Sequence, residues 1–427
     1  MATGILKNDT KEAIIAYLKY KNPYPEPLKE TLNIHYQNKL PTAKILQPLH
    51  TNFINILTNE KKINISASDL ILGDNIFALH KLIQQKTTVD LIYLDPPYNT
   101  GMEFQTRSQE HAYSDFFSLS AYVEYMRIRL ILMKEILSKE GSLYVHIGYQ
   151  MMPYLKIILD EVFGSENCRN IITRKKCSSK NSTKNQFSNL NDFLLFYTKS
   201  SNYIWNQQGE IPSKQWIDKE YPKFDNKGRY KLVPIHAPGT RNGETGKEWN
   251  GKLPPKGKHW QYTPEKLDAL DAIGNIHWSK NNNPRRKVYL TDDKLLPYSD
   301  YWANFRDAHH QNIQITGYPT EKNLDMLKMI ISASSNPESL ILDPFCGSGT
   351  TLQAANETKR NWIGIDQSIT AIKYSIQRIN IGTKKMGDYI SNVPTNNTYS
   401  SIKHKKFRLL TDVDIYQQFK SDIDQIL

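Results

Sequence analysis

The amino-acid sequence predicts an α/β fold in which a doubly wound sheet is split by a large inserted domain. Short apolar runs, typical of buried parallel strands, alternate with helical stretches in two parts of the chain, residues 65–163 and 324–366. Between residues 200 and 315 this alternation stops, and tryptophans lie scattered among glycine, proline, asparagine and charged residues. A length of 427 residues also exceeds what one core comfortably holds. One sheet interrupted by an insertion therefore fits better than two separate sheets.

The first part is expected to supply three strands, each followed by a helix. The strands are short apolar runs, and the helices carry apolar residues at a spacing of three or four. In chain order, the sequence predicts a strand at 70–72, a helix at 75–84, a strand at 89–94, a helix at 120–137, a strand at 142–147 and a helix at 153–163.

The second part repeats the alternation after the insertion. It predicts a helix at 324–334, a strand at 339–343, a glycine-rich turn with a helix behind it, and a strand at 362–366. The insertion lacks long helical periodicity, so short strands and long loops are expected there. At the N-terminus, lysines around a short apolar stretch at 1–21 predict an amphipathic helix.

The charge balance points to a polyanionic partner, because 55 Lys and Arg against 43 Asp and Glu give a net charge of +12. Hydrophobic residues make up 39% of the chain, which excludes disorder along its whole length. Three cysteines give neither a disulfide framework nor a spaced zinc site, so no metal is expected. No apolar run is long enough to cross a membrane, and a soluble, cytoplasmic protein is expected.

The residues Asp95-Pro96-Pro97-Tyr98 follow directly after the strand predicted at 89–94. In a doubly wound sheet, ligands bind at the carboxyl ends of strands, and two prolines there form a rigid turn without amide hydrogens. An aspartate beside the carbonyls of such a turn presents two acceptors to one point, which suits an NH2 group. Tyr98 adds a flat stacking surface. The alternative is a strand-ending turn in which Asp95 caps a helix.

A second motif, residues 343–351, also joins a buried strand to a helix. It reads Asp-Pro-Phe-Cys-Gly-Ser-Gly-Thr-Thr, and its glycines allow a ligand to approach the backbone at a helix N-terminus. No lysine follows Gly349, which disfavours the phosphate-binding loop of a nucleoside triphosphatase. Leu352 stands where a third glycine would complete a dinucleotide-binding motif.

Two further acids end predicted strands. Asp366 is placed to accept hydrogen bonds from ribose hydroxyls, and the alternative is that it caps the next helix. Asp74 precedes the helix at 75–84, where an N-cap and a contact with an adenine ring both stay open.

Together, residues 95–98 and 343–349 resemble the paired signature motifs of amino-group DNA methyltransferases that depend on S-adenosylmethionine. The first motif precedes the second by 248 residues, which is similar to the permuted β class of that family. Residues 141–147, 170–174 and 317–322 are further matches. The resemblance covers about residues 65–380 and implies a Rossmann-like, circularly permuted sheet with a target-recognition insertion.

On this basis the chain is expected to have five parts. They are an N-terminal helical extension (1–48), the first part of the catalytic domain (49–199), the target-recognition insertion (200–315), the second part of the catalytic domain (316–385) and a C-terminal extension (386–427).

The resemblance also implies a role for each motif residue. The catalytic residues would be Asp95, Pro96, Pro97 and Tyr98. Those that bind S-adenosylmethionine would be Asp74, Thr320, Lys322, Asp343, Phe345, Cys346, Gly347, Gly349 and Asp366. Its methionine part would lie on the turn 345–349, its ribose on Asp366 and its adenine near Asp74. The Cys346 thiol is expected to pack in the turn and not to act as a nucleophile.

The resemblance also implies how a poor nucleophile is activated. An exocyclic base amine is a poor nucleophile because its lone pair is delocalised into the ring. Acceptors for both N–H groups, on Asp95 and the Pro96 carbonyl, would expose that lone pair and stabilise the positive charge that develops on nitrogen. The base must leave the duplex, and Tyr98 is its expected stacking partner.

Basic residues between the two motifs are expected to contact DNA phosphates, and the insertion alone holds 18 Lys and Arg against 13 Asp and Glu. The predicted contacts are Arg174, Lys175, Lys176, Lys180, Lys184, Arg285 and Arg286. Double-stranded DNA is thus the expected substrate. A cognate restriction endonuclease subunit and a second copy of the chain are the further partners implied, in a bacterial or phage-encoded restriction-modification system.

Three alternatives bear on the target. In the family, an initial Asp in the catalytic motif goes with the N6 amine of adenine more often than with the N4 amine of cytosine. RNA or protein-amide methylation is disfavoured by the large basic insertion. A DNA-binding modification subunit that needs a partner for activity is the alternative of a different class, and the intact Asp95, Tyr98, Gly347 and Gly349 argue against it.

Overall fold

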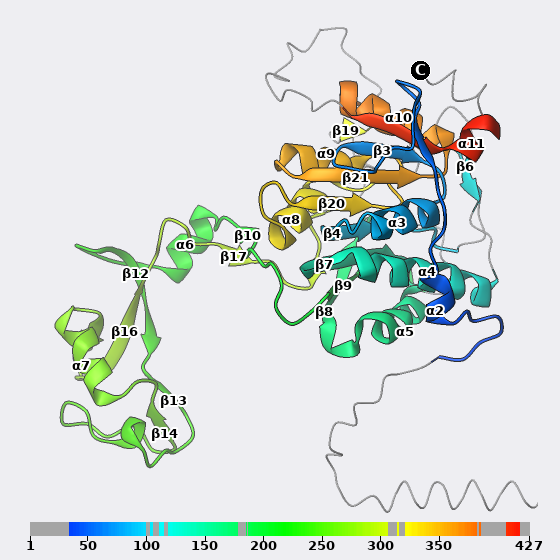
Figure 1. Cartoon of the computed structure of the whole chain (residues 1–427). Helices are drawn as coiled ribbons and strands as arrows, with labels where there is room; N and C mark the ends of the chain where they lie inside the picture. The colour runs from blue at the N-terminus through cyan, green and yellow to red at the C-terminus, as the bar shows by residue number, and fades with distance from the viewer. Residues whose placement is uncertain are drawn as a thin grey trace, which may run out of the picture. The chain divides into compact units, whose positions relative to one another are not determined.

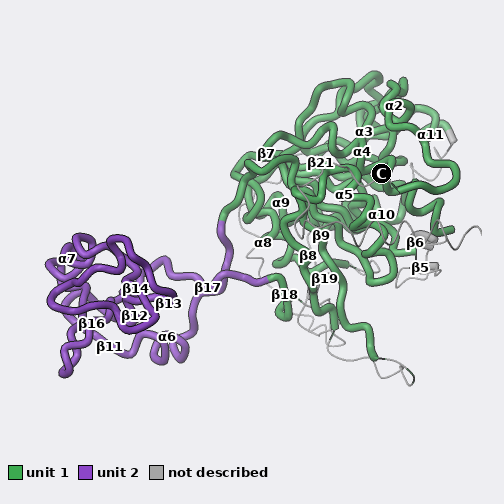
Figure 2. The backbone as a smooth tube through the Cα atoms, turned by 90° about the horizontal axis from the view of Figure 1, so that it is seen from below, with its two compact units in different colours: residues 1–206, 300–427 green, residues 207–299 purple. Residues whose placement is uncertain are grey.

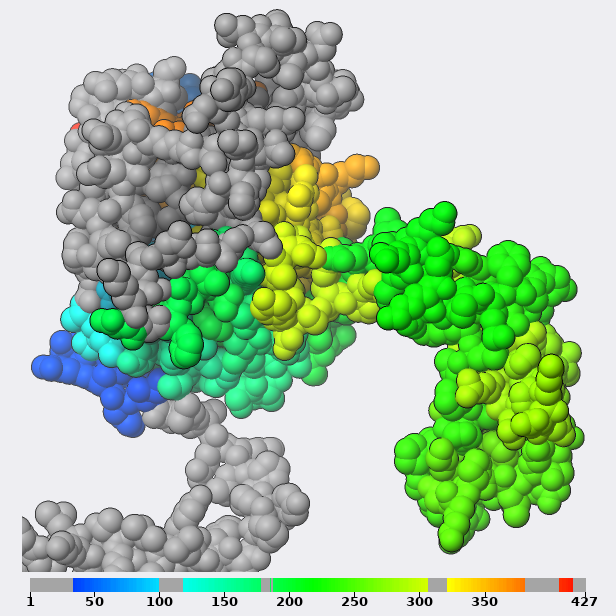
Figure 3. Space-filling model, turned by 180° about the vertical axis from the view of Figure 1, so that it is seen from behind, coloured from blue at the N-terminus to red at the C-terminus, as the bar shows by residue number. Residues whose placement is uncertain are grey.

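The computed structural model describes residues 34–99, 118–177, 187–305, 321–381 and 407–418, with residue 185 and short strands at 103–105, 111–114, 314–315 and 384–385. These residues are coloured in Figures 1 and 3. The helix predicted at 1–21 lies outside them. The chain forms two compact units, which are Met1–Asn206 with Asp300–Leu427, and Gln207–Ser299 (Figure 2). The expected insertion at 200–315 therefore contains the second unit, while its two ends belong to the first.

An eleven-stranded sheet forms the centre of the first unit (Figure 1). Its inner strands are almost wholly buried, which explains why they are continuous apolar runs in the sequence. In sheet order the strands are β18 (Tyr301–Trp302), β8 (Cys168–Lys175), β9 (Asn191–Thr198), β7 (Leu137–Ile147), β4 (Val89–Leu94), β20 (Leu340–Asp343), β21 (Asn361–Asp366), β3 (Asp69–Leu72), β23 (Arg408–Asp412), β1 (Phe53–Asn55) and β2 (Glu60–Lys61). The six strands from β7 to β23 run parallel to one another.

The connections leave the middle of this sheet in opposite directions. Helix α3 (Asn75–Gln84) leads from β3 to β4 and α4 (Leu119–Ile136) leads on to β7, whereas α9 (Thr350–Glu357) leads from β20 to β21. Because such crossovers are right-handed, the first two helices cover one face and α9 covers the other. The direction changes between β4 and β20, and such a switch point is where doubly wound sheets bind ligands. The α/β fold and its interrupted sheet are confirmed.

Most predicted elements are observed close to their expected bounds. The helices at 75–84 and 324–334 are present with those bounds as α3 and α8 (Leu324–Ser334), and the helix at 153–163 is α5 (Met152–Phe163). The strand predicted at 142–147 is longer than expected, because β7 begins at Leu137 directly after α4. Strand β9 has no counterpart among the predicted elements. The other helices and strands of this unit are α2 (Thr42–Ile45), β5 (Glu103–Gln105), β6 (His111–Ser114), β19 (Gln314–Ile315), α10 (Ile369–Ile381), β22 (Lys384–Lys385) and α11 (Val413–Gln418).

The C-terminal part of the chain corrects one expectation. Residues 386–427 were expected to form an extension, but β23 pairs in parallel with β3 and antiparallel with β1 inside the central sheet. Leu409 and Leu410 are buried there, and Arg408 lies 2.7 Å from the buried carboxylate of Asp69. An apolar pair between charged residues is too short a pattern to predict such a strand.

The second unit has a small sheet and a core of its own. Its antiparallel sheet has the order β11 (Lys223–Asp225), β12 (Gly228–Pro234), β16 (Pro284–Tyr289) and β15 (Ile276–Trp278). The core includes Trp249 and Trp260, whose indole N–H groups donate to Asp268 and to the Lys247 carbonyl. The remaining elements are β10 (Gly209–Glu210), α6 (Lys214–Glu220), β13 (His236–Pro238), β14 (Lys258–Trp260), α7 (Pro264–Ala272) and β17 (Leu296–Pro297).

Across the described parts of both units, no helix combines the length and the apolar character needed to cross a membrane.

Candidate active site

Four predicted motifs meet at the carboxyl edge of the central sheet. Strands β4 and β20 are parallel neighbours, with Ile92 opposite Leu342. The proline turn (residues 95–98) follows β4, and the glycine turn (residues 344–349) follows β20. Asp366 ends β21 and Asp74 follows β3, the next two strands in the sheet. The structure therefore brings these residues together at the switch point of the fold.

Both carboxylate oxygens of Asp95 have a donor. The Tyr98 hydroxyl donates to Oδ1 at 2.9 Å, and Nζ of Lys322 lies 2.6 Å from Oδ2. Burial, and secondly the charge of Asp95, raises the pKa of Tyr98 well above its usual range, so the hydroxyl remains a donor. The alternative role for Asp95 was to cap a helix. The next helix along the chain is α4, and its N-cap is Ser118.

The proline turn is held from two sides. The Pro97 carbonyl accepts a 2.7 Å hydrogen bond from the hydroxyl of Tyr122 on α4. On the other side the Tyr98 ring lies against Gly148, where an added Cβ would be 3.0 Å from its Cδ2 atom. Pro96 itself is buried. The turn is rigid through its prolines and also through these contacts.

A buried group of ionisable side chains lies behind Tyr98. The His146 ring is 6.3 Å from that of Tyr98, its Nδ1 is 2.8 Å from the Tyr93 hydroxyl, and its Nε2 is 3.6 Å from Oδ2 of Asp192. Burial, then the nearby cations, lowers the pKa of His146, so the imidazole is neutral at pH 7. Burial alone would raise the pKa of Asp192, but its contact with His146 and the charge of Lys176 bring it well below its usual range.

The glycine turn requires glycine at two positions. Gly347 and Gly349 have φ angles of 50° and 75°, and a Cβ on Gly349 would lie 2.8 Å from Oγ of Ser375 on α10. Asp366 closes the turn, since its Oδ2 accepts from the Gly347 amide at 2.9 Å and its Oδ1 from the Ser368 amide at 2.8 Å. Burial raises the pKa of Asp366 to about 6, although these two hydrogen bonds oppose the shift.

Asp343 and Cys346 lie beneath the same turn. Asp343 accepts from the Phe345 amide at 3.0 Å, and burial raises the pKa of its carboxyl to about 7. The Cys346 thiol is buried 4.0 Å from Oγ of Ser375, and burial raises its pKa well above the usual range. A protonated, buried thiol is a poor nucleophile, in line with the packing role expected from the sequence.

Asp74 is the N-cap of α3, because its Oδ1 accepts from the Ile76 amide at 2.9 Å. The same oxygen is 2.9 Å from Arg129 on α4, whose guanidinium lies 3.4 Å from the centre of the Tyr125 ring. Tyr125 in turn is beside Phe345 of the glycine turn, with ring centres 6.4 Å apart. The N-cap alternative is thus present, and the adenine contact stays a prediction.

The basic residues expected to contact DNA differ in how far they are exposed. Arg174 was expected to contact phosphates but is fully buried, with Nε donating to the Phe305 carbonyl at 2.7 Å, so that expectation is wrong. Lys176 lies 2.6 Å from Asp192 and Lys175 is half-buried. Arg285 is exposed, whereas its neighbour Arg286 is half-buried, 5.5 Å from the Tyr262 ring. Lys180 and Lys184 lie outside the described residues. The same holds for Thr320, which was expected to bind S-adenosylmethionine.

Several side chains at this site were missed in the sequence. Tyr122, Tyr125 and Arg129 fall within the helix predicted at 120–137, and the apolar spacing that predicts this helix says nothing about the ligand edge of the sheet. Asp192 lies in a strand that was not predicted, and His146 was noted only within a matching segment. A histidine inside an otherwise apolar strand is the one local signal that could have singled out a member of this set.

A family model described as DNA methylase matches residues 89–377 of the chain, more than half of its length. The chain belongs to this DNA methylase family. This DNA methyltransferase is 54% identical to the Type II methyltransferase M.EcaI of Enterobacter cloacae, over 92% of this chain and 87% of that one. The DNA adenine methyltransferase YhdJ of Escherichia coli is 24% identical over 82% of this chain and 94% of its own length.

More distant similarities extend to larger proteins and to solved structures. The type III restriction-modification enzyme StyLTI Mod subunit of Salmonella typhimurium is 27% identical over 84% of this methyltransferase, which spans 63% of that subunit. The M1.HpyAVI–SAM complex has a TM-score of 0.39 at 16% identity, over 73% of this chain and 99% of that one. The cytosine-N4-specific PvuII DNA methyltransferase has a TM-score of 0.40 at 15% identity, over 74% and 87%.

Proposed function

We propose that this DNA methyltransferase transfers the methyl group of S-adenosylmethionine to the exocyclic N6 amine of an adenine that has left the duplex. The observation that carries the proposal is the place of Asp95, on a rigid proline turn beside the glycine turn at the switch point of the sheet. The similarity to M.EcaI, a methyltransferase, supports this choice of reaction. The similarity to YhdJ, a DNA adenine methyltransferase, supports adenine as the base.

The residues of the glycine turn fit S-adenosylmethionine. Gly347 and Gly349 leave the backbone free of side chains where a ligand would approach. Each oxygen of Asp366 accepts one backbone hydrogen bond and retains a second lone pair, so ribose hydroxyls can still donate to it. Two acidic groups, Asp343 and Asp366, also suit a cationic ligand. S-adenosylmethionine supplies an electrophilic methyl group on a sulfonium sulfur.

Asp95 and the proline turn would prepare the base amine. The Asp95 carboxylate keeps lone pairs that neither Tyr98 nor Lys322 occupies, and one of these can accept one N–H of the amine. The Pro96 carbonyl can accept the other N–H. With both N–H groups held, the nitrogen lone pair is directed out of the ring plane. The fixed carboxylate would stabilise the positive charge that forms on nitrogen as the N–C bond is made and the bond between the methyl group and sulfur breaks, and nitrogen then loses one proton to solvent.

Recognition of a DNA sequence would belong to the second unit. It is a separately folded domain with exposed Arg285 on β16, where a side chain can reach phosphates or base edges. A restriction endonuclease subunit and a second copy of the chain are further partners that we propose, the former supported by the Mod subunits among the relatives.

The test is methyl transfer to DNA by the wild type and by Asp95→Asn, with the modified base identified by mass spectrometry. The substitution keeps the shape but removes the charge, so the rate should fall about 100-fold or more. Binding of S-adenosylmethionine, followed by calorimetry, should change little. Asp325→Asn is a matched control, since that side chain on α8 is 82% exposed.

Each outcome has a distinct meaning. N6-methyladenine in the product supports the proposal, and N4-methylcytosine would replace adenine by cytosine as the target. An Asp95→Asn enzyme as fast as Asp325→Asn would remove Asp95 from the mechanism.

A further inference from the structure

We infer that the N-terminal segment (residues 34–40) holds helix α4 in the position from which this helix fixes both the proline turn and the glycine turn. Glu124 and Arg127 are then positioning residues for methyl transfer, and neither belongs to a motif that the sequence singled out. The inference rests on the proposed function, because its effect is read in cofactor binding and methyl transfer.

One stripe of α4 contacts both turns. Tyr122, Tyr125 and Arg129 are spaced by three and four residues and therefore share a helix face. Tyr122 donates to the Pro97 carbonyl, and Tyr125 lies beside Phe345. Arg129 binds Asp74 at 2.9 Å. A small shift or rotation of α4 would therefore move both turns together.

A second connection reaches the glycine turn through Asn75. Nε of Arg129 donates to Oδ1 of Asn75 at 2.7 Å, and Nδ2 of Asn75 donates to the Pro344 carbonyl at 2.8 Å. All three groups are buried or nearly so. Helix α4 is thus joined to the backbone of the glycine turn by a continuous line of hydrogen bonds.

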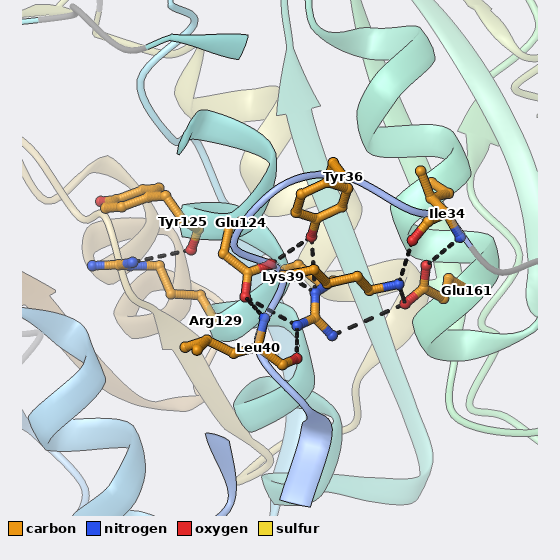
Figure 4. A network of polar contacts seen from close by, with 9 residues as sticks. Ile34, Tyr36, Lys39, Leu40, Glu124, Tyr125, Arg129 and Glu161 are labelled. Carbon is orange, nitrogen blue, oxygen red and sulfur yellow. Dashed lines mark hydrogen bonds and ion pairs between the residues drawn. The ribbon is translucent and has the colours of Figure 1, made fainter. Parts of the chain in front are cut away.

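A different stripe of α4 faces the N-terminal segment (Figure 4). Glu124 accepts from the Tyr36 hydroxyl at 2.5 Å and from the Leu40 amide at 2.9 Å. Arg127, one turn further along α4, binds both Glu124 oxygens and the Tyr36 hydroxyl, and donates to the Leu40 carbonyl. The segment thereby supplies hydrogen-bond partners to both members of a buried ion pair.

The segment is also fixed to the neighbouring helix α5. Glu161 of α5 accepts from the Ile34 amide at 3.1 Å and lies 2.7 Å from Nζ of Lys39, which donates to the Ile34 carbonyl (Figure 4). The segment therefore bridges α4 and α5 and resists movement of one helix against the other.

Burial gives this arrangement its rigidity. The Arg127 side chain is 1% exposed and that of Glu124 is 13% exposed. A buried charge that loses its partners is strongly disfavoured, so α4 has one favourable position with the segment in place. The pKa of Glu124, which burial alone would raise, is brought below its usual range by the hydrogen bonds from Arg127 and Tyr36.

The main test is the double variant Glu124→Gln/Arg127→Met in the full chain. Both charges are removed, so neither is left buried and unpaired. We expect affinity for S-adenosylmethionine, measured by calorimetry, to fall about 3- to 30-fold, with a similar loss in kcat on DNA. We also expect faster amide hydrogen exchange in residues 119–136, while the melting temperature stays close to that of the wild type.

A milder variant keeps the inference testable if the double variant does not fold. Tyr36→Phe removes one hydroxyl from the network and should weaken cofactor binding about 2- to 5-fold. Tyr154→Phe is the matched control, because Tyr154 on α5 is 41% exposed.

Failure of the inference differs from failure of the proposed function. A wild-type enzyme that methylates DNA, with variants of unchanged affinity, kcat and hydrogen exchange, would overturn the inference alone. A wild type that binds no S-adenosylmethionine would overturn the proposed function, and hydrogen exchange in α4 would then still decide whether the segment holds this helix.

Discussion

Asp343 shows how strongly position changes the chemistry of a single residue. It ends β20 directly before the glycine turn and is 2% exposed. Burial raises the pKa of its carboxyl to about 7, so this group titrates close to neutral pH instead of in the acidic range of an exposed aspartate. The free energy needed to bury this carboxyl is small at low pH, where the group is neutral, and it increases as the group ionises.

We expect Asp343→Asn to remove a pH dependence from stability. The folded pKa lies above the unfolded value, so the folded state binds more protons between pH 4 and 7, and stability falls as pH rises through that window. Relative to the variant, the wild type should lose up to about 1.4 kcal/mol of unfolding free energy per pH unit there. Urea unfolding at several pH values checks this, and parallel curves for both proteins would contradict it.

At the scale of elements, the glycine turn depends on its contact with α10. Arg378 of α10 is buried, and its Nε donates to the Ser348 carbonyl at 2.6 Å while Nη2 lies 2.8 Å from Glu321. Ser375 donates to the Gly347 carbonyl at 2.8 Å. Helix α10 therefore supports the glycine turn and also the residue beside Lys322, the partner of Asp95.

Gly349→Ala should disturb this arrangement more than alanine at a glycine with similar φ. Gly349 (φ 75°) would place a Cβ 2.8 Å from Ser375, whereas Gly274 (φ 72°) in the second unit has nothing within 4 Å. Gly274→Ala should cost about 1 kcal/mol from backbone strain alone. Gly349→Ala should cost about 1–3 kcal/mol more and weaken binding of S-adenosylmethionine. Thermal unfolding and calorimetry measure both, and equal losses in the two variants would contradict the close contact.

At the scale of the whole molecule, the chain enters and leaves the second unit through two adjacent strands, β10 and β17. Gly209 pairs with Pro297, and the Tyr298 amide donates to the Gln208 carbonyl at 3.3 Å. Just outside these strands, Asn206 binds the backbone of Ser332 and Ser335, and Trp302 pairs with Arg174 of β8. The residues at 200–206 and 300–305 thus support the catalytic sheet, although composition placed them in the insertion.

Replacing Gln207–Ser299 by a short glycine-serine linker should separate catalysis from recognition. Each unit has its own core, and the two ends to be joined are close, so the catalytic sheet should fold. We expect affinity for S-adenosylmethionine within about twofold of the wild type, since the residues expected to hold the cofactor belong to the first unit. Methylation of the wild type's DNA sites should be lost, which single-molecule sequencing of treated DNA measures. Unchanged site selectivity would contradict the recognition role.

The sequence by itself determined the inner strands of the sheet, several helices and the two turns. Strands β4, β20 and β21 and helices α3 and α8 were predicted because their signals are local, whether an unbroken apolar run or a helical period with a capping Asp or Asn. Asp95 and the glycine turn were expected at the same edge of the sheet because each follows a buried strand. Parallel packing of such strands places their carboxyl ends along one edge.

Only the tertiary structure decided which side chains meet. Lys322 reaches Asp95, Asn75 reaches Pro344, and Arg174 is buried although it begins a basic run. Strand β23 completes the sheet from the far end of the chain. In each case the partners are distant in the sequence or the pattern is too short to be read. The free energy of such contacts depends on burial and distance, which exist only once the chain has folded.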